Sequence, residues 1–115
     1  MTNNNFEFLM CKSGWGVSVQ AQKSNYCTPR ETGAKAYTHV ELGFPTAPEP
    51  LIAGFADQPD NPTETVYGYV PVGIVQAVIV KHGGIESGEH PPFQLDANQA
   101  AIMAEAMQQI EEEVR

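Results

Sequence analysis

Residues 64–84 read ETVYGYVPVGIVQAVIVKHGG and join a strand pattern directly to a helix pattern. In the first part, the alternation of a strand places Tyr67 and Tyr69 on one face and Val66 and Val70 on the other. We expect the valine face to pack in the core. The two tyrosines are then left on a face that the monomer does not bury, which predicts an oligomer or a bound ligand.

The second part of this stretch has helical spacing. Pro71 ends the strand, because it has no N–H for the ladder, and it can occupy the first turn of a helix. The β-branched content favours a strand, but Lys81 and His82 in the last turn and Gly83 as a left-handed cap favour a helix. Two adjoining apolar stripes follow the helical period: Val72, Val75 and Ile79, and beside them Ile74 and Val78.

The chain before this stretch predicts an antiparallel sheet. Residues 6–11 are a short strand candidate, and residues 15–21 alternate with the clearest period of two, so we expect a hairpin with its turn at residues 12–14. Residues 36–44 are the next strand.

Shorter segments are less well determined. Thr46 and Glu49 have the spacing of a capping box, so residues 51–56 are either one or two helical turns or a strand. Residues 85–92 are expected to form a polar loop, and residues 93–95 a short edge strand.

A final helix begins at the capping residue Asp96, with Gln99 completing a capping box. The predicted fold is therefore a single α+β domain over residues 1–115, with an N-terminal antiparallel sheet packed against two C-terminal helices. The apolar side of the final helix comprises Ile102, Met103, Ala106, Ile110 and Val114.

The chain is acidic, with a formal net charge of −8. Its basic residues are scattered singly, which disfavours direct binding of DNA or RNA, and the acidic run 111–113 fits the solvated end of a helix. Cys11 and Cys27, with no signal peptide before them, indicate reduced thiols and a cytoplasmic protein, although a disulfide remains an alternative. The apolar run 70–80 is too short to span a membrane.

Candidate binding residues lie on the strand 36–44 and on the loop before it. Tyr37, His39 and Glu41 share one strand face, within reach of a ligand or of a second subunit, although a solvated strand face is the alternative. The polar loop 23–35 is long enough to suggest a function and carries Arg30.

Patterns that carry chemistry are weak. His82, Glu86, Glu89 and His90 bring together metal-ligand types, but their spacing matches no short metal motif, and His82 already suits the negative end of the helix dipole. Nucleophilic catalysis could use the types found at Cys27, His39 and Glu41, yet no nucleophile motif accompanies them. We therefore expect no catalytic residue, no metal and no cofactor.

Three short segments carry a resemblance: ELGFP at 41–45, VYGYVP at 66–71 and KHGGI at 81–85. Together with the order of the elements, they resemble small phage-encoded proteins of the first Thoeris anti-defence family, which sequester a cyclic ADP-ribose signal. The resemblance covers about half the chain. It implies a non-catalytic sponge built as a homo-oligomer, with ligand pockets shared between subunits, in the cytosol of the host cell.

The residues themselves also favour binding over chemistry. We expect a nucleotide-derived small molecule to stack on Tyr67 or Tyr69, and its phosphates to be held by Arg30 and the terminal Arg115. Tyr37 and His39 complete the predicted ligand-binding set. The alternative is an acidic protein–protein inhibitor of the anti-CRISPR type, and a small hydrolase using His39, or a metal at His82 and His90, comes third.

Overall fold

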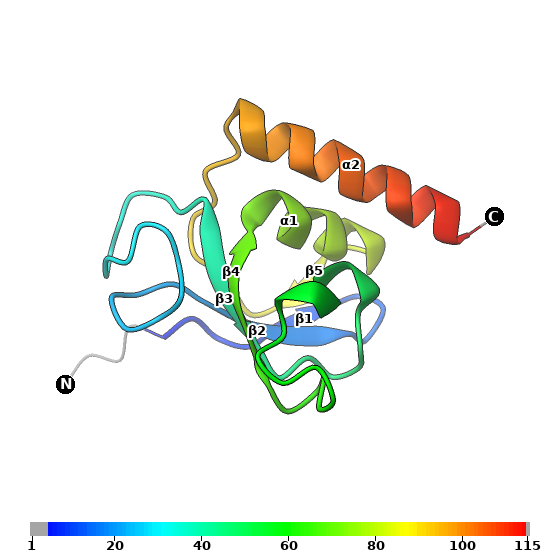
Figure 1. The fold of residues 1–115 in the computed structure, drawn as a ribbon, viewed down its shortest axis with the longest axis horizontal. Helices are drawn as coiled ribbons and strands as arrows, with labels where there is room; N and C mark the ends of the chain where they lie inside the picture. The colour runs from blue at the N-terminus through cyan, green and yellow to red at the C-terminus, as the bar shows by residue number, and fades with distance from the viewer. Residues whose placement is uncertain (1–4, 115) are drawn as a thin grey trace.

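The computed structural model describes residues 5–114, and within them the chain forms one five-stranded antiparallel sheet and two α-helices. Figure 1 shows α1 between the sheet and α2, so the fold has three layers. This confirms the predicted α+β class. The elements in chain order are β1 (Leu9–Cys11), β2 (Gly16–Gln20), β3 (His39–Gly43), the 3₁₀ helix η1 (Pro50–Phe55), β4 (Val66–Pro71), α1 (Val72–Lys81), β5 (Ile85–Ser87) and α2 (Ala97–Glu113).

The strand order in the sheet is β4-β3-β2-β1-β5. The predicted hairpin is present, with Leu9 of β1 opposite Val17 of β2. The expected loop after residue 84 instead begins with β5, which pairs with β1 at the edge of the sheet. The expected edge strand at 93–95 reduces to a single bridge between Phe93 and Tyr37.

The turn from strand to helix at Pro71 is confirmed. Pro71 is the last residue of β4, and α1 starts directly after it. The helix ends in a Schellman motif, since Gly83 N–H donates to Val80 O and Gly84 N–H donates to Ile79 O. Gly83 has a φ of 90°, the left-handed conformation expected of it.

The prediction that Tyr67 and Tyr69 share one exposed face of β4 is wrong. Tyr67 is buried, with 1% of its surface exposed, whereas the exposed fraction of Tyr69 is 44%. Tyr69 has a φ of 51°, and the register between β3 and β4 shifts at the same place, so the alternation of faces restarts there. Tyr67 and Val70 therefore share the core, and Tyr69 alone points outward.

The capping box predicted at Thr46 and Glu49 is also wrong. Glu49 is itself the N-cap of η1, where its carboxylate accepts from Leu51 N–H at 3.0 Å. Thr46 pairs instead with Gly16, accepting from its N–H through Oγ1 at 3.0 Å. The segment 51–56, open between helix and strand on sequence grounds, is a 3₁₀ helix up to Phe55.

Asp96 caps α2 as predicted, because its carboxylate accepts from Gln99 N–H at 2.9 Å. The Gln99 side chain does not close a capping box but accepts from Gly73 N–H in the first turn of α1. On the apolar side of α2, Ala106 is buried, whereas Val114 is exposed and departs from the prediction. Across residues 5–114, none of the helices is long and apolar enough to cross a membrane.

Candidate ligand-binding surface

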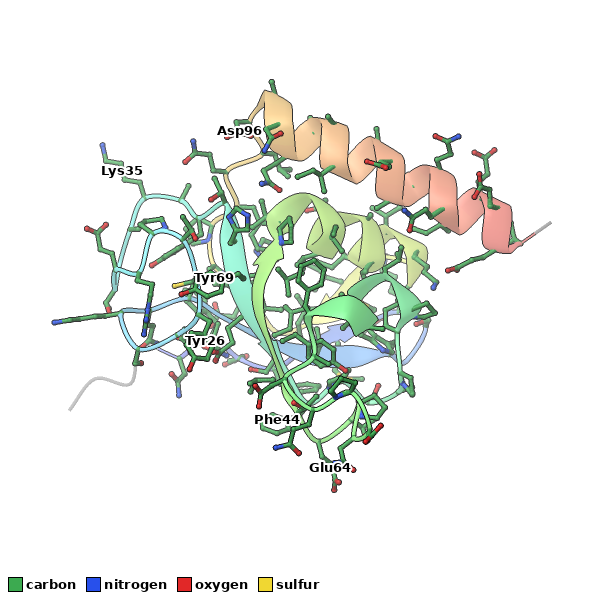
Figure 2. All side chains as sticks on the ribbon, viewed as in Figure 1. Tyr26, Lys35, Phe44, Glu64, Tyr69 and Asp96 are labelled. Carbon is green, nitrogen blue, oxygen red and sulfur yellow. The ribbon has the colours of Figure 1, made fainter. Side chains whose placement is uncertain are left out.

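Two exposed tyrosines are in contact where the loop 23–35 packs against the sheet: Tyr26 comes from the loop and Tyr69 from β4. The ring centroids of Tyr26 and Tyr69 are 5.7 Å apart with a tilt of 37°, and the Arg30 guanidinium carbon lies 5.5 Å from the centre of the Tyr26 ring. Figure 2 labels the two tyrosines, which lie next to one another on one side of the molecule. We call Tyr26, Tyr69 and Arg30 the aromatic surface.

The backbone holds Tyr26 firmly against β4. Tyr69 N–H donates to Tyr26 O at 3.0 Å, and Tyr26 N–H donates to the Glu41 carboxylate at 3.1 Å. A Cβ on Gly68 would lie 3.2 Å from the Tyr26 Cβ, so glycine at this position lets the tyrosine approach the strand.

Tyr69 displays its ring from a strained backbone. A positive φ is an outlier for a bulky residue and costs on the order of 1–3 kcal/mol, and such strain concentrates at binding and active sites. Over residues 5–114, the other non-glycine residue with a positive φ is Phe44, at 52°, which is also an exposed aromatic.

A shallow hollow of about 310 Å³ adjoins the two tyrosines. Among the described residues that line it, Asp57 is the only charged one, and its N–H donates to Val66 O at 2.9 Å. A carboxylate beside aromatic rings can accept hydrogen bonds from ribose hydroxyls. The other lining residues are Tyr26, Phe55, Ala56, Val66, Gly68 and Tyr69.

The loop 23–35 is the positive part of an acidic chain. It contains Lys23, Arg30 and Lys35 against a single acidic residue, Glu31, a net charge of +2. The rest of the sequence has three basic and thirteen acidic residues, a net charge of −10.

The structure brings together two of the six predicted binding residues, Tyr69 and Arg30, which meet through Tyr26. Tyr67 and Tyr37 lie in the core, each with 1% of its surface exposed, so the prediction that they present exposed faces is wrong. His39 is half-buried on β3, where its Nδ1 lies 2.9 Å from Thr38 Oγ1. Arg115 lies outside the described residues.

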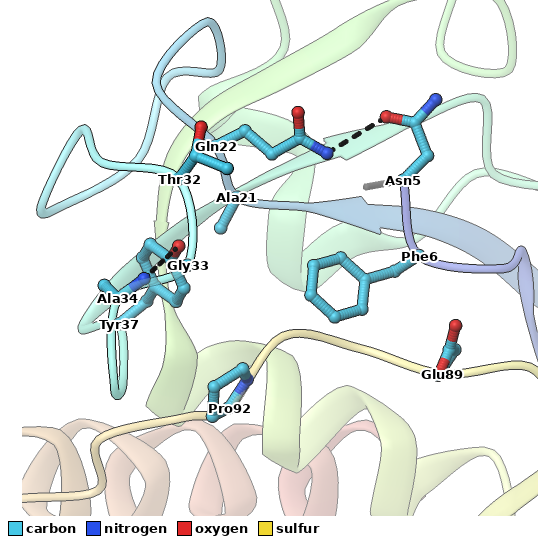
Figure 3. A pocket seen from close by; sticks show the side chains of 10 residues that line it. All are labelled: Asn5, Phe6, Ala21, Gln22, Thr32, Gly33, Ala34, Tyr37, Glu89 and Pro92. Atoms are coloured by element: carbon cyan, nitrogen blue, oxygen red, sulfur yellow. Dashed lines mark hydrogen bonds between the residues drawn. The ribbon is translucent and has the colours of Figure 1, made fainter. Parts of the chain in front are cut away.

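Buried Tyr37 anchors the loop. Its hydroxyl donates to Glu31 O at 2.6 Å and accepts from Ala34 N–H at 3.1 Å. It also forms one wall of a second hollow of about 430 Å³, shown with Phe6 and Pro92 in Figure 3. Glu89 is the only charged residue among those described around that hollow.

Tyr26 and Asp57 are not among the binding residues predicted from the sequence. Tyr26 could have been included, because it lies four residues from Arg30 in the loop 23–35, whose length suggests a function. Asp57 carries no such signal, because its segment lies beside β4 through tertiary contacts, the bridge from Ala56 to Tyr67 and the hydrogen bond from Asp57 N–H to Val66 O.

Two of the residues considered for nucleophilic catalysis, Cys27 and Glu41, make local hydrogen bonds to neighbouring segments. Burial raises the pKa of the Cys27 thiol and keeps it protonated, and its Sγ donates to Gln22 O and Pro29 O. The Glu41 carboxylate accepts from Asn25 Nδ2 at 2.9 Å as well as from the Tyr26 backbone. Both cysteines are free, in agreement with the predicted reduced thiols, and both are buried.

The four possible metal ligands do not assemble. Within residues 5–114, no group of three or more histidine, cysteine or carboxylate side chains could hold a metal ion. His82 Nε2 lies 2.8 Å from Glu49, and the His90 ring stacks on Phe93 with centroids 3.9 Å apart.

A scan against protein-family models matched none of them, and searches of curated proteins and of solved structures also returned no match.

Proposed function

We propose that the protein binds and sequesters a nucleotide-derived signalling molecule of the cyclic ADP-ribose type at the aromatic surface. The observation that carries the proposal is the strained Tyr69 beside Tyr26 and Arg30, at the positive loop of a chain that is otherwise strongly acidic. A planar base stacks on tyrosine, and phosphate is attracted to the guanidinium.

Each group at this surface has a separate role in the proposal. The exposed face of Tyr69 stacks the base, and Arg30 makes charge-assisted hydrogen bonds to phosphate. Asp57 accepts hydrogen bonds from ribose hydroxyls.

The size of the hollow favours a shared pocket. Its volume of about 310 Å³ is at the lower end of the roughly 300–1,000 Å³ of small-molecule sites, and it is open to solvent. A ligand with two phosphates and two ribose rings needs more contact surface than the hollow of one copy provides. We therefore include in the proposal a homo-oligomer in which a second copy closes the surface.

The resemblance to Thoeris anti-defence proteins supplies the biological setting of the proposal. In that setting the chain is phage-encoded, acts in the host cytosol and removes a host defence signal.

The test is calorimetry with cyclic ADP-ribose, ADP-ribose and AMP, on the wild type and on matched variants. Tyr69→Ala should weaken binding by about 1–3 kcal/mol, roughly 5- to 150-fold. Phe44→Ala is the matched control, because it removes another exposed aromatic from left-handed backbone and should leave affinity unchanged. Absence of binding at micromolar concentrations for all three ligands would refute the proposal.

The sequence outside the loop 23–35 has a net charge of −10, which favours one second candidate function. In it, the protein is an acidic inhibitor that occupies a partner's basic groove. The two functions respond differently to salt. Binding through a broad acidic surface should weaken steeply between low and high ionic strength, whereas a stacked ligand should respond less.

A further inference from the structure

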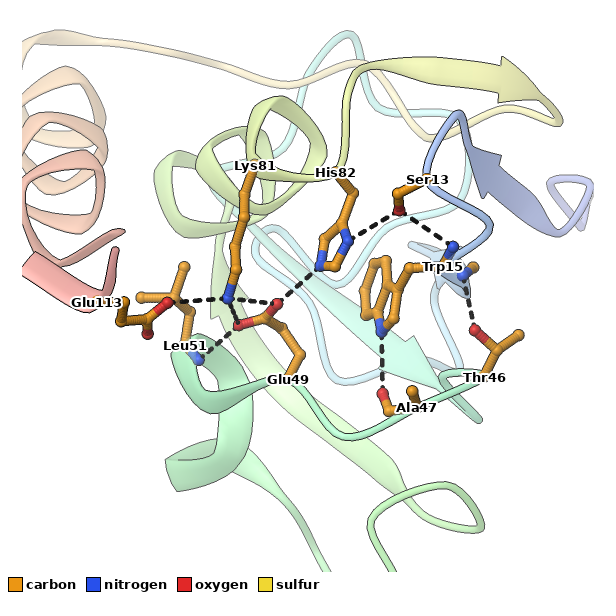
Figure 4. Close-up of polar contacts among 10 residues, drawn as sticks. Ser13, Trp15, Thr46, Ala47, Glu49, Leu51, Lys81, His82 and Glu113 are labelled. Carbon is orange, nitrogen blue, oxygen red and sulfur yellow. Dashed lines mark hydrogen bonds and ion pairs between the residues drawn. The ribbon is translucent and has the colours of Figure 1, made fainter. Parts of the chain in front are cut away.

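Three polar side chains from distant parts of the sequence form a chain of hydrogen bonds at the C-terminal end of α1. Ser13 Oγ lies 3.0 Å from His82 Nδ1, and His82 Nε2 lies 2.8 Å from Glu49 Oε1 (Figure 4). Ser13 belongs to the turn between β1 and β2, Glu49 precedes η1, and His82 ends α1. Ser13 is exposed and Glu49 is buried.

The fold fixes the positions of Ser13 and His82. Ser13 N–H donates to His82 O and Lys12 N–H donates to Gly84 O, each at 3.0 Å, which ties the hairpin turn to the helix cap. The Trp15 indole stacks on the imidazole, with ring centroids 4.7 Å apart and 13° between planes. The imidazole plane is therefore set independently of its two polar partners.

The position of the imidazole proton follows from Glu49. Burial alone would raise the pKa of this carboxyl, but hydrogen bonds from Leu51 N–H, His82 and Lys81 outweigh burial and hold the pKa below its ordinary value. An ionised carboxylate only accepts hydrogen bonds, so Nε2 is the protonated nitrogen whenever the His82 ring carries a single proton. Nδ1 then has a free electron pair that accepts the Ser13 hydroxyl proton.

We propose that Ser13 is the nucleophile of a second site, with His82 as its general base and Glu49 as the residue that positions His82. The division of roles is that of a Ser-His-acid triad, with the two ring nitrogens exchanged relative to the serine-protease arrangement. The site is independent of ligand capture at the aromatic surface, and its substrates are small acyl esters.

The chemical step is acyl transfer. Ser13 Oγ forms a bond to the ester carbonyl carbon while its proton passes to His82 Nδ1, and the alcohol leaves with that proton as the C–O ester bond breaks. Water then attacks the acyl-serine, giving the carboxylic acid and regenerating the hydroxyl. The positive imidazole formed in each half is stabilised by Glu49 and by the negative end of α1.

The surroundings suit a small apolar acyl group. A shallow groove of about 580 Å³ beside Ser13 is lined by Gly14, Trp15, Thr46, Ala47, Pro48 and His82. The backbone N–H of Trp15 donates to Ser13 Oγ at 3.3 Å, which stabilises the negative charge that develops on this oxygen. The Thr46 hydroxyl accepts from Gly16 N–H, and its own proton, which that bond does not use, can donate to an acyl oxygen in the groove.

The test is covalent labelling with phenylmethylsulfonyl fluoride, which transfers its sulfonyl group to an activated serine and releases fluoride and a proton. Intact mass and peptide mapping should show one adduct, on Ser13. His82→Phe keeps a ring on Trp15 but removes the base, and it should slow labelling at least about 100-fold. Ser24→Ala removes an exposed serine of the loop 23–35 and should leave labelling unchanged.

Glu49→Gln should lower the maximal labelling rate without changing the concentration of reagent at half saturation, because Glu49 acts through His82. Wild-type protein should also release one equivalent of p-nitrophenolate from p-nitrophenyl butyrate in an initial burst, and Ser13→Ala should not. No adduct on the wild type, equal labelling of Ser24, or a rate unaffected by His82→Phe would overturn the proposal. Ser13→Ala should retain the nucleotide binding that Tyr69→Ala weakens, so the two proposals fail separately.

Discussion

Gln99 Oε1 of α2 accepts a hydrogen bond from Gly73 N–H in the first turn of α1, over a donor–acceptor distance of 3.0 Å. Pro71 at the N-cap of α1 makes no side-chain cap bond, so the start of this helix is capped by the next helix in the sequence. The same pair is in close contact, because a Cβ on Gly73 would lie 2.3 Å from Gln99 O.

Gly73→Ala should therefore destabilise the protein by about 1–3 kcal/mol, since the methyl group meets the backbone of α2 and forces the two helices apart. Chemical denaturation monitored by circular dichroism measures the change. Gly54→Ala is the matched control, because a Cβ there has no neighbour within 4 Å. Equal stability of the two variants would show that the contact between the helices tolerates the extra methyl group.

Stability should depend on the ionisation of Glu49, whose side chain is 1% exposed and contacts Lys81 at 3.0 Å. The folded pKa lies below the ordinary value of 4.5, so the stability from Glu49 is complete above that pH and is lost as the pH falls through the folded pKa. Glu49→Gln should cost about 1.5–3 kcal/mol at neutral pH. Denaturation midpoints of the variant and the wild type should converge in acid; a constant difference across the range would contradict this.

The strain at Tyr69 should be measurable as a preference for glycine. At a φ of 51°, Tyr69→Gly should be more stable than Tyr69→Ala by about 1–2 kcal/mol, because only glycine adopts left-handed backbone without cost. Both variants lose the ring, so the comparison isolates the backbone. At Ser18 in β2, the alanine variant should instead be the more stable of the pair; the same order at both positions would argue against strain at Tyr69.

Patterns that depend on neighbours in sequence predicted the fold well. The helix from Val72 to its glycine cap and the hairpin of residues 6–21 are local, and both are present. β5 could not be predicted, because its three exposed residues have no apolar alternation and pair only through contact with β1.

The candidate site was harder to predict. The sequence pattern of residues 66–70 predicts strand alternation through Tyr69. In the structure Tyr69 has left-handed backbone, so Tyr69 is exposed and Val70 is buried on the same side as Tyr67. Propensity gives no reason to expect that conformation in a tyrosine. Arg30 could be chosen from its loop, whereas its contact with Tyr26 depends on how that loop folds back over the sheet.

The two hydrogen bonds of the Tyr37 hydroxyl give that buried residue an indirect part in recognition. They tie Glu31 and Ala34 to the core, and so hold the segment between Arg30 and Lys35 in one conformation. A binder whose cations are ordered in advance loses less conformational entropy when its ligand arrives, and so retains more of the interaction energy as affinity. Tyr37→Phe should accordingly lower the affinity for an anionic ligand, although Tyr37 itself is buried and acts only by holding the loop.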